Sequence, residues 1–168
     1  MKQNTSVSLK AVDRVEVTTL IDNYVDLLLP STVERTTSFE KGMPNALMEE
    51  DGELVFDPIL DDQAIVMKLM GKGMVVISGC AHSGIVNTMM YAKKTTGEQK
   101  IHAVLGGFHL SGPFFEKIHD PTIEALKAMD PEVLMPMHCT GWKATQRFQK
   151  EFPESFVLNS VGSKVMLT

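Results

Sequence analysis

The sequence has few of the features that mark secreted, membrane or nucleic-acid-binding proteins. Only two of its 168 residues are cysteines, Cys80 and Cys139, which excludes a disulfide-stapled domain and favours a reducing, cytoplasmic setting. No apolar run approaches the roughly 18 residues of a membrane span, so no membrane partner is expected. The 16 basic residues are outnumbered by 21 acidic ones. The chain therefore has no polycationic face, and nucleic acid is not expected as a partner.

Several well-known catalytic motifs are also absent. The sequence contains no P-loop, and no G-x-G-x-x-G follows a predicted strand. Ser83 follows a histidine but has no nucleophile-elbow pattern around it. What remains is ordinary globular composition, with 43% hydrophobic and 22% charged residues. This length and composition predict one domain over residues 1–168.

The second half of the chain predicts an alternation of strands and helices, and therefore a layered α/β domain. Helix N-caps are predicted at Ser83 and Asp120. The Asp51-Gly52 pair predicts a hairpin turn. Strands are expected over residues 14–21, 64–69, 74–78, 101–105, 133–137, 156–158 and 164–167, and helices over residues 84–94, 120–129 and 141–151.

Three histidines, His82, His109 and His138, each follow one of three successive buried strands. Ligands of α/β proteins gather just beyond the carboxyl ends of strands. Imidazole is the commonest protein ligand of zinc and iron, and three imidazoles can hold a catalytic metal with an open position. The sequence therefore predicts a shared metal site, although a lone histidine at a strand end is more often structural. His102 begins a strand and is excluded, and His119 is expected at the surface.

Cysteines and acids near these histidines leave two interpretations open. Cys80 and Cys139 each lie within two residues of a predicted ligand and are candidate thiolate ligands or nucleophiles. The favoured interpretation is that they are small fillers of packed loops. Asp61 and Asp62 precede a strand. One interpretation is that they supply a carboxylate ligand to the metal, and the other is that they are acidic residues of an ordinary turn.

Two further residues are candidates for substrate binding. Asn87 lies one turn into the helix after His82. One interpretation is that its side chain orients a ligand or substrate, and the other is that it is a partly exposed helix residue. Lys143 follows His138 at a helix start, a position that favours anions, and is otherwise a common surface residue.

Four segments, in order, resemble the metallo-β-lactamase superfamily, specifically its dihydropterin ribofuranosyl-aminobenzene phosphate synthase-like branch. They are residues 61–64, 79–87, 106–110 and 138–143. The resemblance implies a four-layer αββα sandwich that holds one or two ions of zinc, iron or manganese at one edge. It implies hydrolysis of a small-molecule ester or phosphoester. It places His82 and His138 on metal-ligand loops and His109 on a loop that supplies a ligand or a substrate contact.

The superfamily signature H-x-H-x-D-H is missing from this sequence. It would lie between the first strand and Ser38, where only a short polar link, residues 31–37, is present. We therefore expect an incomplete αββα sandwich whose exposed sheet edges promote homo-oligomers. Two functional hypotheses follow. The chain is a metal-dependent hydrolase, or it is a non-catalytic relic or interaction module that binds metal, an anion or a partner chain.

Overall fold

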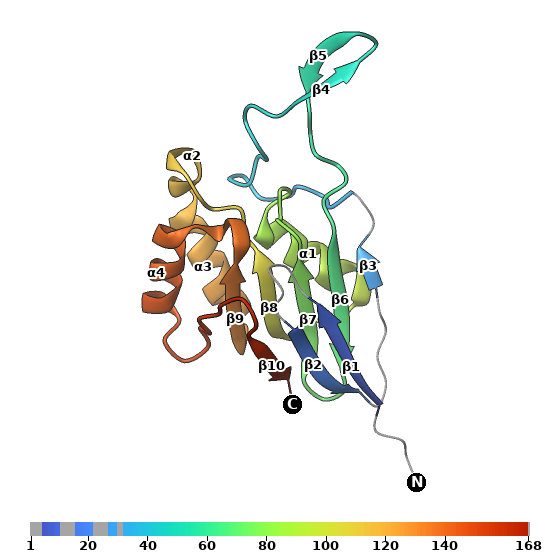
Figure 1. Ribbon diagram of the computed structural model, residues 1–168, viewed down its shortest axis with the longest axis vertical. Coiled ribbons are helices and arrows are strands. Elements are labelled where there is room, and N and C mark those ends of the chain that lie inside the picture. The colour runs from blue at the N-terminus through green and yellow to red at the C-terminus, as the bar shows by residue number, and fades with distance from the viewer. Residues whose placement is uncertain (1–4, 11–15, 22–26, 30–31, 168) are drawn as a thin grey trace.

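The computed structural model describes residues 5–10, 16–21, 27–29 and 32–167, and its centre is a five-stranded sheet (Figure 1). The strand order is β3 (Leu27–Leu29), β6 (Ala64–Leu69), β7 (Gly73–Ser78), β8 (Ile101–Gly107) and β9 (Val133–Met137). β3, β6 and β7 pair antiparallel, whereas β7, β8 and β9 are parallel. The parallel strands therefore place their carboxyl ends at one edge.

Helices connect the parallel strands, as the sequence predicts. α1 (Ile85–Thr96) joins β7 to β8, and α2 (Pro113–Glu116) and α3 (His119–Met129) join β8 to β9. α4 (Trp142–Glu151) follows β9. Buried residues of α1, α3 and α4 share one hydrophobic cluster with the strands, so these helices cover one face of the sheet.

A second sheet lies on the other face. It consists of β1 (Thr5–Lys10), β2 (Glu16–Ile21) and β10 (Lys164–Leu167), with β1 antiparallel and β10 parallel to β2. Leu167 packs in a second hydrophobic cluster with residues of β6 to β9. No described helix contributes to this second cluster. The α/β class is confirmed, and the described residues supply three layers, αββ, of the four-layer sandwich.

Burial on both faces explains the apolar run in β7. All its residues are buried, and Met74 and Val76 belong to the cluster on the helical face. Val75 and Ile77 belong to the cluster between the sheets. A strand covered on both faces needs apolar residues at every position, so it shows no polar alternation.

The predicted hairpin forms an arm that projects from the domain (Figure 1). β4 (Leu47–Glu50) pairs with β5 (Glu53–Phe56) around Asp51 and Gly52, whose φ values of 53° and 83° suit a tight turn. The exposed apolar side chains of this arm include Leu47, Leu54 and Phe56. These apolar side chains lie beside the acidic residues of the same arm and are not covered by the described chain.

Some local predictions are wrong. α1 has Gly84 and α3 has Ile118 at the N-cap position, so neither Ser83 nor Asp120 is the cap. His119 is buried rather than at the surface, and its ring nitrogen lies 2.9 Å from the Leu110 carbonyl oxygen. The ring uses its polar edge to satisfy a buried backbone group.

The remaining differences concern strand limits. Residues 156–158 form no strand, because only an isolated bridge joins Leu134 to Phe156. The first residues of the strand predicted over 14–21 lie outside the described residues, and β2 begins at Glu16. None of the described helices has the length and apolar content needed to cross a membrane.

Candidate functional site

The loops after β7, β8 and β9 hold the three predicted histidines, and each loop contains a strained residue. Ala81, His109 and His138 have φ values of 54°, 47° and 53°, in the left-handed region that residues with a side chain seldom adopt. Such strain persists only where the surrounding structure enforces it, and it concentrates at functional sites. One strained residue in each loop marks this edge of the sheet as the candidate site.

Gly107, at the end of β8, lets the neighbouring loops approach each other. A Cβ atom at Gly107 would lie 2.6 Å from the Gly79 carbonyl oxygen and 2.8 Å from the Cys139 sulfur. The Gly107 N–H donates a hydrogen bond of 3.1 Å to that same carbonyl. The loop after β7 and the loop after β9 therefore meet over a residue that has no side chain.

Two thiols and an imidazole gather at this point. Among the described residues, Cys80, His138 and Cys139 are the one group of three potential metal ligands whose ligand atoms all lie within 4.8 Å of one another. The Cys139 thiol donates to the Cys80 carbonyl at 3.5 Å. Burial first, and then the neighbouring Cys80, raise the pKa of Cys139 to about 12. The structure thus brings both cysteines next to His138 in packed loops. Their role as ligands stays a prediction beside that of small fillers.

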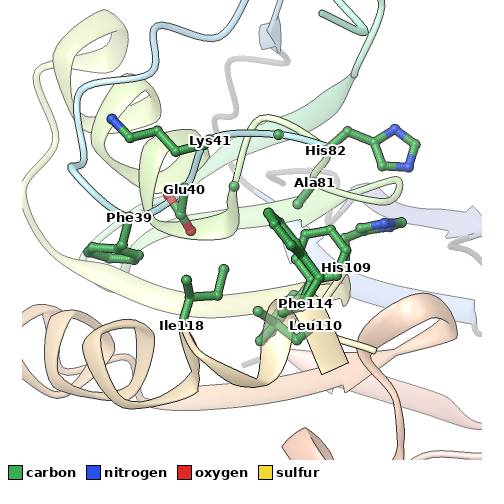
Figure 2. A pocket seen from close by; sticks show the side chains of 13 residues that line it. Phe39, Glu40, Lys41, Ala81, His82, His109, Leu110, Phe114 and Ile118 are labelled. Atoms are coloured by element: carbon green, nitrogen blue, oxygen red, sulfur yellow. The ribbon is translucent and has the colours of Figure 1, made fainter. Parts of the chain in front are cut away.

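The other two histidines form a pair of their own. The rings of His82 and His109 are 4.6 Å apart, edge to face, and Figure 2 shows both pointing to one side, away from Glu40. Burial first, and then the charge of His82, lower the pKa of His109. Its Nδ1 atom is buried with no hydrogen-bond partner in the described chain. His109 therefore presents a buried ring nitrogen that has no hydrogen-bond partner among the described residues, and burial favours the neutral form of the ring.

The two aspartates have different positions. Asp62 is buried, and its Oδ2 atom accepts a hydrogen bond of 2.9 Å from the Ser83 N–H. This bond fixes the loop that carries His82. Asp61 is exposed in the preceding turn. Asp62 thus positions the loop, while Asp61 makes no hydrogen bond to it in the described structure.

The two predicted substrate-binding residues are engaged elsewhere. Asn87 is fully buried, and its side-chain oxygen accepts hydrogen bonds of 2.9 Å from the backbone N–H groups of Thr36 and Thr37. Its amide nitrogen donates to the Ser83 carbonyl at 2.8 Å. Lys143 is exposed and forms an ion pair of 2.8 Å with Glu116. The structure thus shows Asn87 in a structural network and Lys143 in a surface ion pair.

Sequence reasoning missed Glu40, a buried carboxyl group that lies across a pocket from the histidine pair (Figure 2). Its oxygens accept hydrogen bonds from the N–H groups of Val86 and Asn87, at 3.0 and 2.8 Å, in the first turn of α1. Gly84 must be glycine here, because its φ is +99° and a Cβ would lie 2.2 Å from this carboxyl group. Glu40 caps a helix that begins more than forty residues later, so no local pattern signals it.

A small apolar pocket separates Glu40 from the histidine rings (Figure 2). Its wall is formed by aromatic and aliphatic side chains, with His82 and His109 also lining it. The apolar members include Phe39, Phe108, Phe114, Phe115 and Ile118. This pocket gives the candidate site a hydrophobic wall beside its imidazoles.

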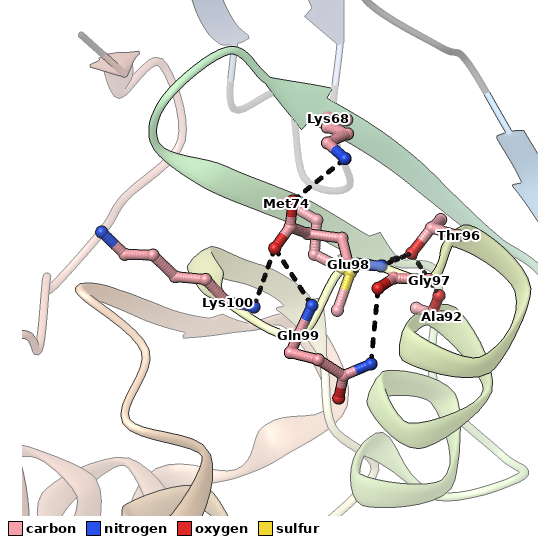
Figure 3. A network of polar contacts seen from close by, with 8 residues as sticks. All are labelled: Lys68, Met74, Ala92, Thr96, Gly97, Glu98, Gln99 and Lys100. Carbon is pink, nitrogen blue, oxygen red and sulfur yellow. Dashed lines mark hydrogen bonds and ion pairs between the residues drawn. The ribbon is translucent and has the colours of Figure 1, made fainter.

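The opposite edge of the sheet carries a structural network instead (Figure 3). Glu98 accepts hydrogen bonds of 3.0 and 3.1 Å from the N–H groups of Gln99 and Lys100, and it pairs with Lys68 at 3.1 Å. The backbone bond from Lys100 is the main reason why the pKa of Glu98 is lowered. The hydrogen bonds and the ion pair of Glu98 therefore hold the turn between α1 and β8.

The comparisons with known proteins identify the family and the fold. No family model matches the chain. The chain is similar to a curated protein of Methanocaldococcus jannaschii, 7,8-dihydropterin-6-methyl-4-(beta-D-ribofuranosyl)-aminobenzene-5'-phosphate synthase. The two sequences are 38% identical over 124 residues, which cover 73% of this chain and 42% of that protein. The solved structure of Tm1679, a metal-dependent hydrolase of the β-lactamase superfamily, matches with a TM-score of 0.70 and 30% identity, over 82% of this chain and 51% of that one.

The chain belongs to the metallo-β-lactamase superfamily. A second relative, an uncharacterised protein of Methanocaldococcus jannaschii, is 36% identical over 137 residues, which cover 82% of this chain and 48% of that protein. The chain spans about half the length of the relatives it matches. Membership of the superfamily gives the fold. The chemistry at the carboxyl edge of the sheet depends on the residues present there.

Replacement of Gly107 tests the close approach of the loops. We expect Gly107→Ala to lower the free energy of unfolding by about 1–3 kcal/mol, because the new methyl group meets the Gly79 carbonyl at 2.6 Å. Gly79→Ala is the matched control, since its Cβ would meet nothing closer than 3.5 Å. Urea unfolding of both variants measures the difference. Equal stability of the two variants would contradict the steric role of Gly107.

Glu40 gives the protein a pH-dependent stability. Burial raises its pKa from 4.5 to about 7, against the lowering effect of its hydrogen bonds. The folded state therefore keeps a proton that the unfolded chain has lost, so stability is highest below pH 4.5 and falls as the pH rises to 7. The pKa shift corresponds to a loss of about 3 kcal/mol in the free energy of unfolding across this pH range. Denaturant unfolding at several pH values should show this loss in the wild type and not in Glu40→Gln.

The control for this measurement is Glu34→Gln. Glu34 is half-exposed and pairs with Lys94 at the surface. This variant should keep the pH dependence of the wild type. An unchanged pH dependence in Glu40→Gln would refute the assignment to Glu40.

Proposed function

We propose that this protein is a metal-dependent hydrolase-type member of the superfamily that acts on a small-molecule ester or phosphoester. The observation that carries the proposal is the convergence of three strained loops, with their histidines and thiols, at the carboxyl edge of β7, β8 and β9. One similar protein of solved structure is titled a metal-dependent hydrolase, which supports the proposed reaction. The curated relative is named a synthase of a 5'-phosphate compound, which supports a phosphorylated small molecule as the substrate class.

The residues at this edge fit a metal ion. The buried, unpartnered Nδ1 atom of His109 and the cluster that contains His138 are donors of the kind that zinc and iron accept. His82, His109 and His138 are the proposed imidazole ligands, and zinc is the first choice before iron or manganese. A bound zinc ion supplies Lewis acidity, which polarises the carbonyl or phosphoryl oxygen of an ester.

The chain's own residues prepare the site for such a substrate. The bond from Ser83 to Asp62 holds the loop that carries His82. Burial lowers the pKa of His109 and so favours its neutral form, the form whose ring nitrogen can bind a metal ion. The apolar wall that includes Phe108 and Phe115 excludes water from one side and accepts a non-polar part of a small substrate.

A second candidate function is a non-catalytic protein that binds metal, an anion or a partner chain through the same loops. The absence of H-x-H from the sequence favours it, because that signature supplies most of the superfamily's metal ligands. Association of two copies through uncovered apolar elements, such as the β4–β5 arm, belongs to this proposal. Bound metal without turnover would support this second function over the first.

The first test is the metal content per chain of protein purified without chelators or metal-affinity resin. We expect near-stoichiometric zinc, iron or manganese in the wild type and its loss in the His82→Ala/His138→Ala double variant. His102→Gln is the control, because His102 lies at the other end of β8, where its ring contacts Glu132 at 2.7 Å. The metal-loaded wild type is then assayed on ester and phosphoester substrates.

The outcomes separate the two functions. Metal together with hydrolysis supports the enzyme, and metal without hydrolysis supports the binding protein. Absence of metal from the wild type, or retention of metal in the double variant, would overturn the proposed imidazole site.

A further inference from the structure

We propose that a hollow beside His138 binds a planar aromatic ring of the substrate, and that this ring stacks on Trp142. The inference rests on the proposed function, because it names the substrate class for the same site. The end of β9, the start of α4 and residues 158–159 form this β9–α4 hollow. Its lining includes Met137, His138, Gly141, Trp142, Leu158 and Asn159.

The backbone fixes the position of Trp142. Gly141, the residue before it, has a φ of 80°, and a Cβ there would lie 2.7 Å from the Cβ of Ser111. The Gly141 carbonyl accepts hydrogen bonds of 3.0 and 2.9 Å from the N–H and the hydroxyl of Thr145. A close glycine turn is therefore followed directly by α4, of which Trp142 is the first residue. The indole ring is thus presented by a rigid element.

Two large apolar side chains remain uncovered in the β9–α4 hollow. Trp142 is 66% exposed and Leu158 is 61% exposed. Aromatic side chains provide much of the contact area where proteins bind ligands, and ligand sites are concave and largely apolar. A ligand that fills the hollow removes apolar surface of both side chains from water, which favours its binding.

Charge decides which ligand suits the indole face. Such a face attracts cations as well as planar rings. The described residues that line the hollow include no carboxylate, so a bound cation would have no counter-charge there. His138, which is exposed and lines the same hollow, is a proposed ligand of a metal cation. A neutral or anionic planar ring is therefore the better occupant.

The size of the hollow suits one or two fused rings, and its position connects it to the proposed site. Its volume is about 230 Å³. A dry protein cavity of roughly 150 Å³ already holds benzene. Asn159 donates a hydrogen bond of 2.9 Å to the Pro136 carbonyl, which fixes this part of the lining. Because His138 also lines the hollow, a substrate whose ring lies on Trp142 has its ester or phosphoester group near the proposed imidazole ligand.

The test uses the fluorescence of Trp142, because the chain contains no other tryptophan. The wild-type chain is titrated with phenyl phosphate and with adenosine monophosphate. Ribose phosphate, which has no aromatic ring, is the control probe. Excitation at the red edge of the indole absorption avoids absorption by the probes. At least one of the two ring compounds should quench the fluorescence to saturation, whereas ribose phosphate should not.

Calorimetric titration extends the test to variants that lack the tryptophan. Trp142→Ala should weaken binding of the quenching compound by about ten- to a hundredfold, the loss typical of a stacked ring. Trp142→Phe keeps an aromatic face and should retain most of the affinity. Leu54→Ala is the matched control, because Leu54 is a similarly exposed apolar residue on the β4–β5 arm. It should leave both the quenching and the affinity unchanged.

The outcomes separate this inference from the proposed function. Absence of quenching by both ring compounds, or equal affinity of the wild type and Trp142→Ala for them, would overturn stacking on Trp142. Metal content and hydrolysis, measured as described above, would still decide the proposed function. Conversely, a wild-type chain that holds no metal but binds a ring compound through Trp142 would support the ring site and overturn the imidazole site.

Discussion

The candidate site depends on the close packing of the ends of β7 and β8. The Ser78 hydroxyl donates to the Gly107 carbonyl at 2.8 Å, and a Cβ at Gly106 would lie only 2.1 Å from the Ser78 carbonyl oxygen. Two adjacent glycines therefore let the backbones approach where side chains would separate them. Because the loop after β9 reaches the same point through Cys139, this approach also determines the distance between the two thiols. The parallel sheet supplies the common edge, and the glycines bring its loops together.

Glu40 connects this edge to a distant part of the chain. The N-terminus of α1 carries unsatisfied N–H groups and a partial positive charge, which a carboxylate stabilises. Glu40 and Asn87 satisfy backbone groups on both sides of the junction between residues 36–40 and α1. α1 directly follows the loop that carries His82, so this buried network and the bond from Ser83 to Asp62 hold the loop from two directions. A raised pKa at Glu40 is the energetic consequence of placing an acid in so enclosed a position.

The sequence predicted those features that depend on short-range patterns. Apolar runs located β6 to β9, and the Asp51-Gly52 pair located the hairpin turn. The strand-end histidines lie on loops at one edge of the sheet, as the strand order requires. The N-caps of α1 and α3 were wrong because tertiary contacts, such as the bond from Val86 to Glu40, replaced the local caps. The clustering of Cys80 with Cys139 joins residues 59 positions apart, and no periodicity carries such information. His119 was misplaced for a similar reason, since its partner Leu110 lies in a preceding loop.

The missing signature bears on both parts of the proposed chemistry. In the superfamily H-x-H-x-D-H supplies the main metal ligands, and this sequence has no H-x-H. The proposed site therefore depends on the imidazoles of His82, His109 and His138, which follow β7, β8 and β9. Activation of a nucleophile also requires a base. Asp62, the buried acid of this region, already accepts a hydrogen bond from the Ser83 N–H, and this bond fixes the loop that carries His82. The described edge thus offers imidazole nitrogens for an ion, whereas its buried carboxylate has a structural partner.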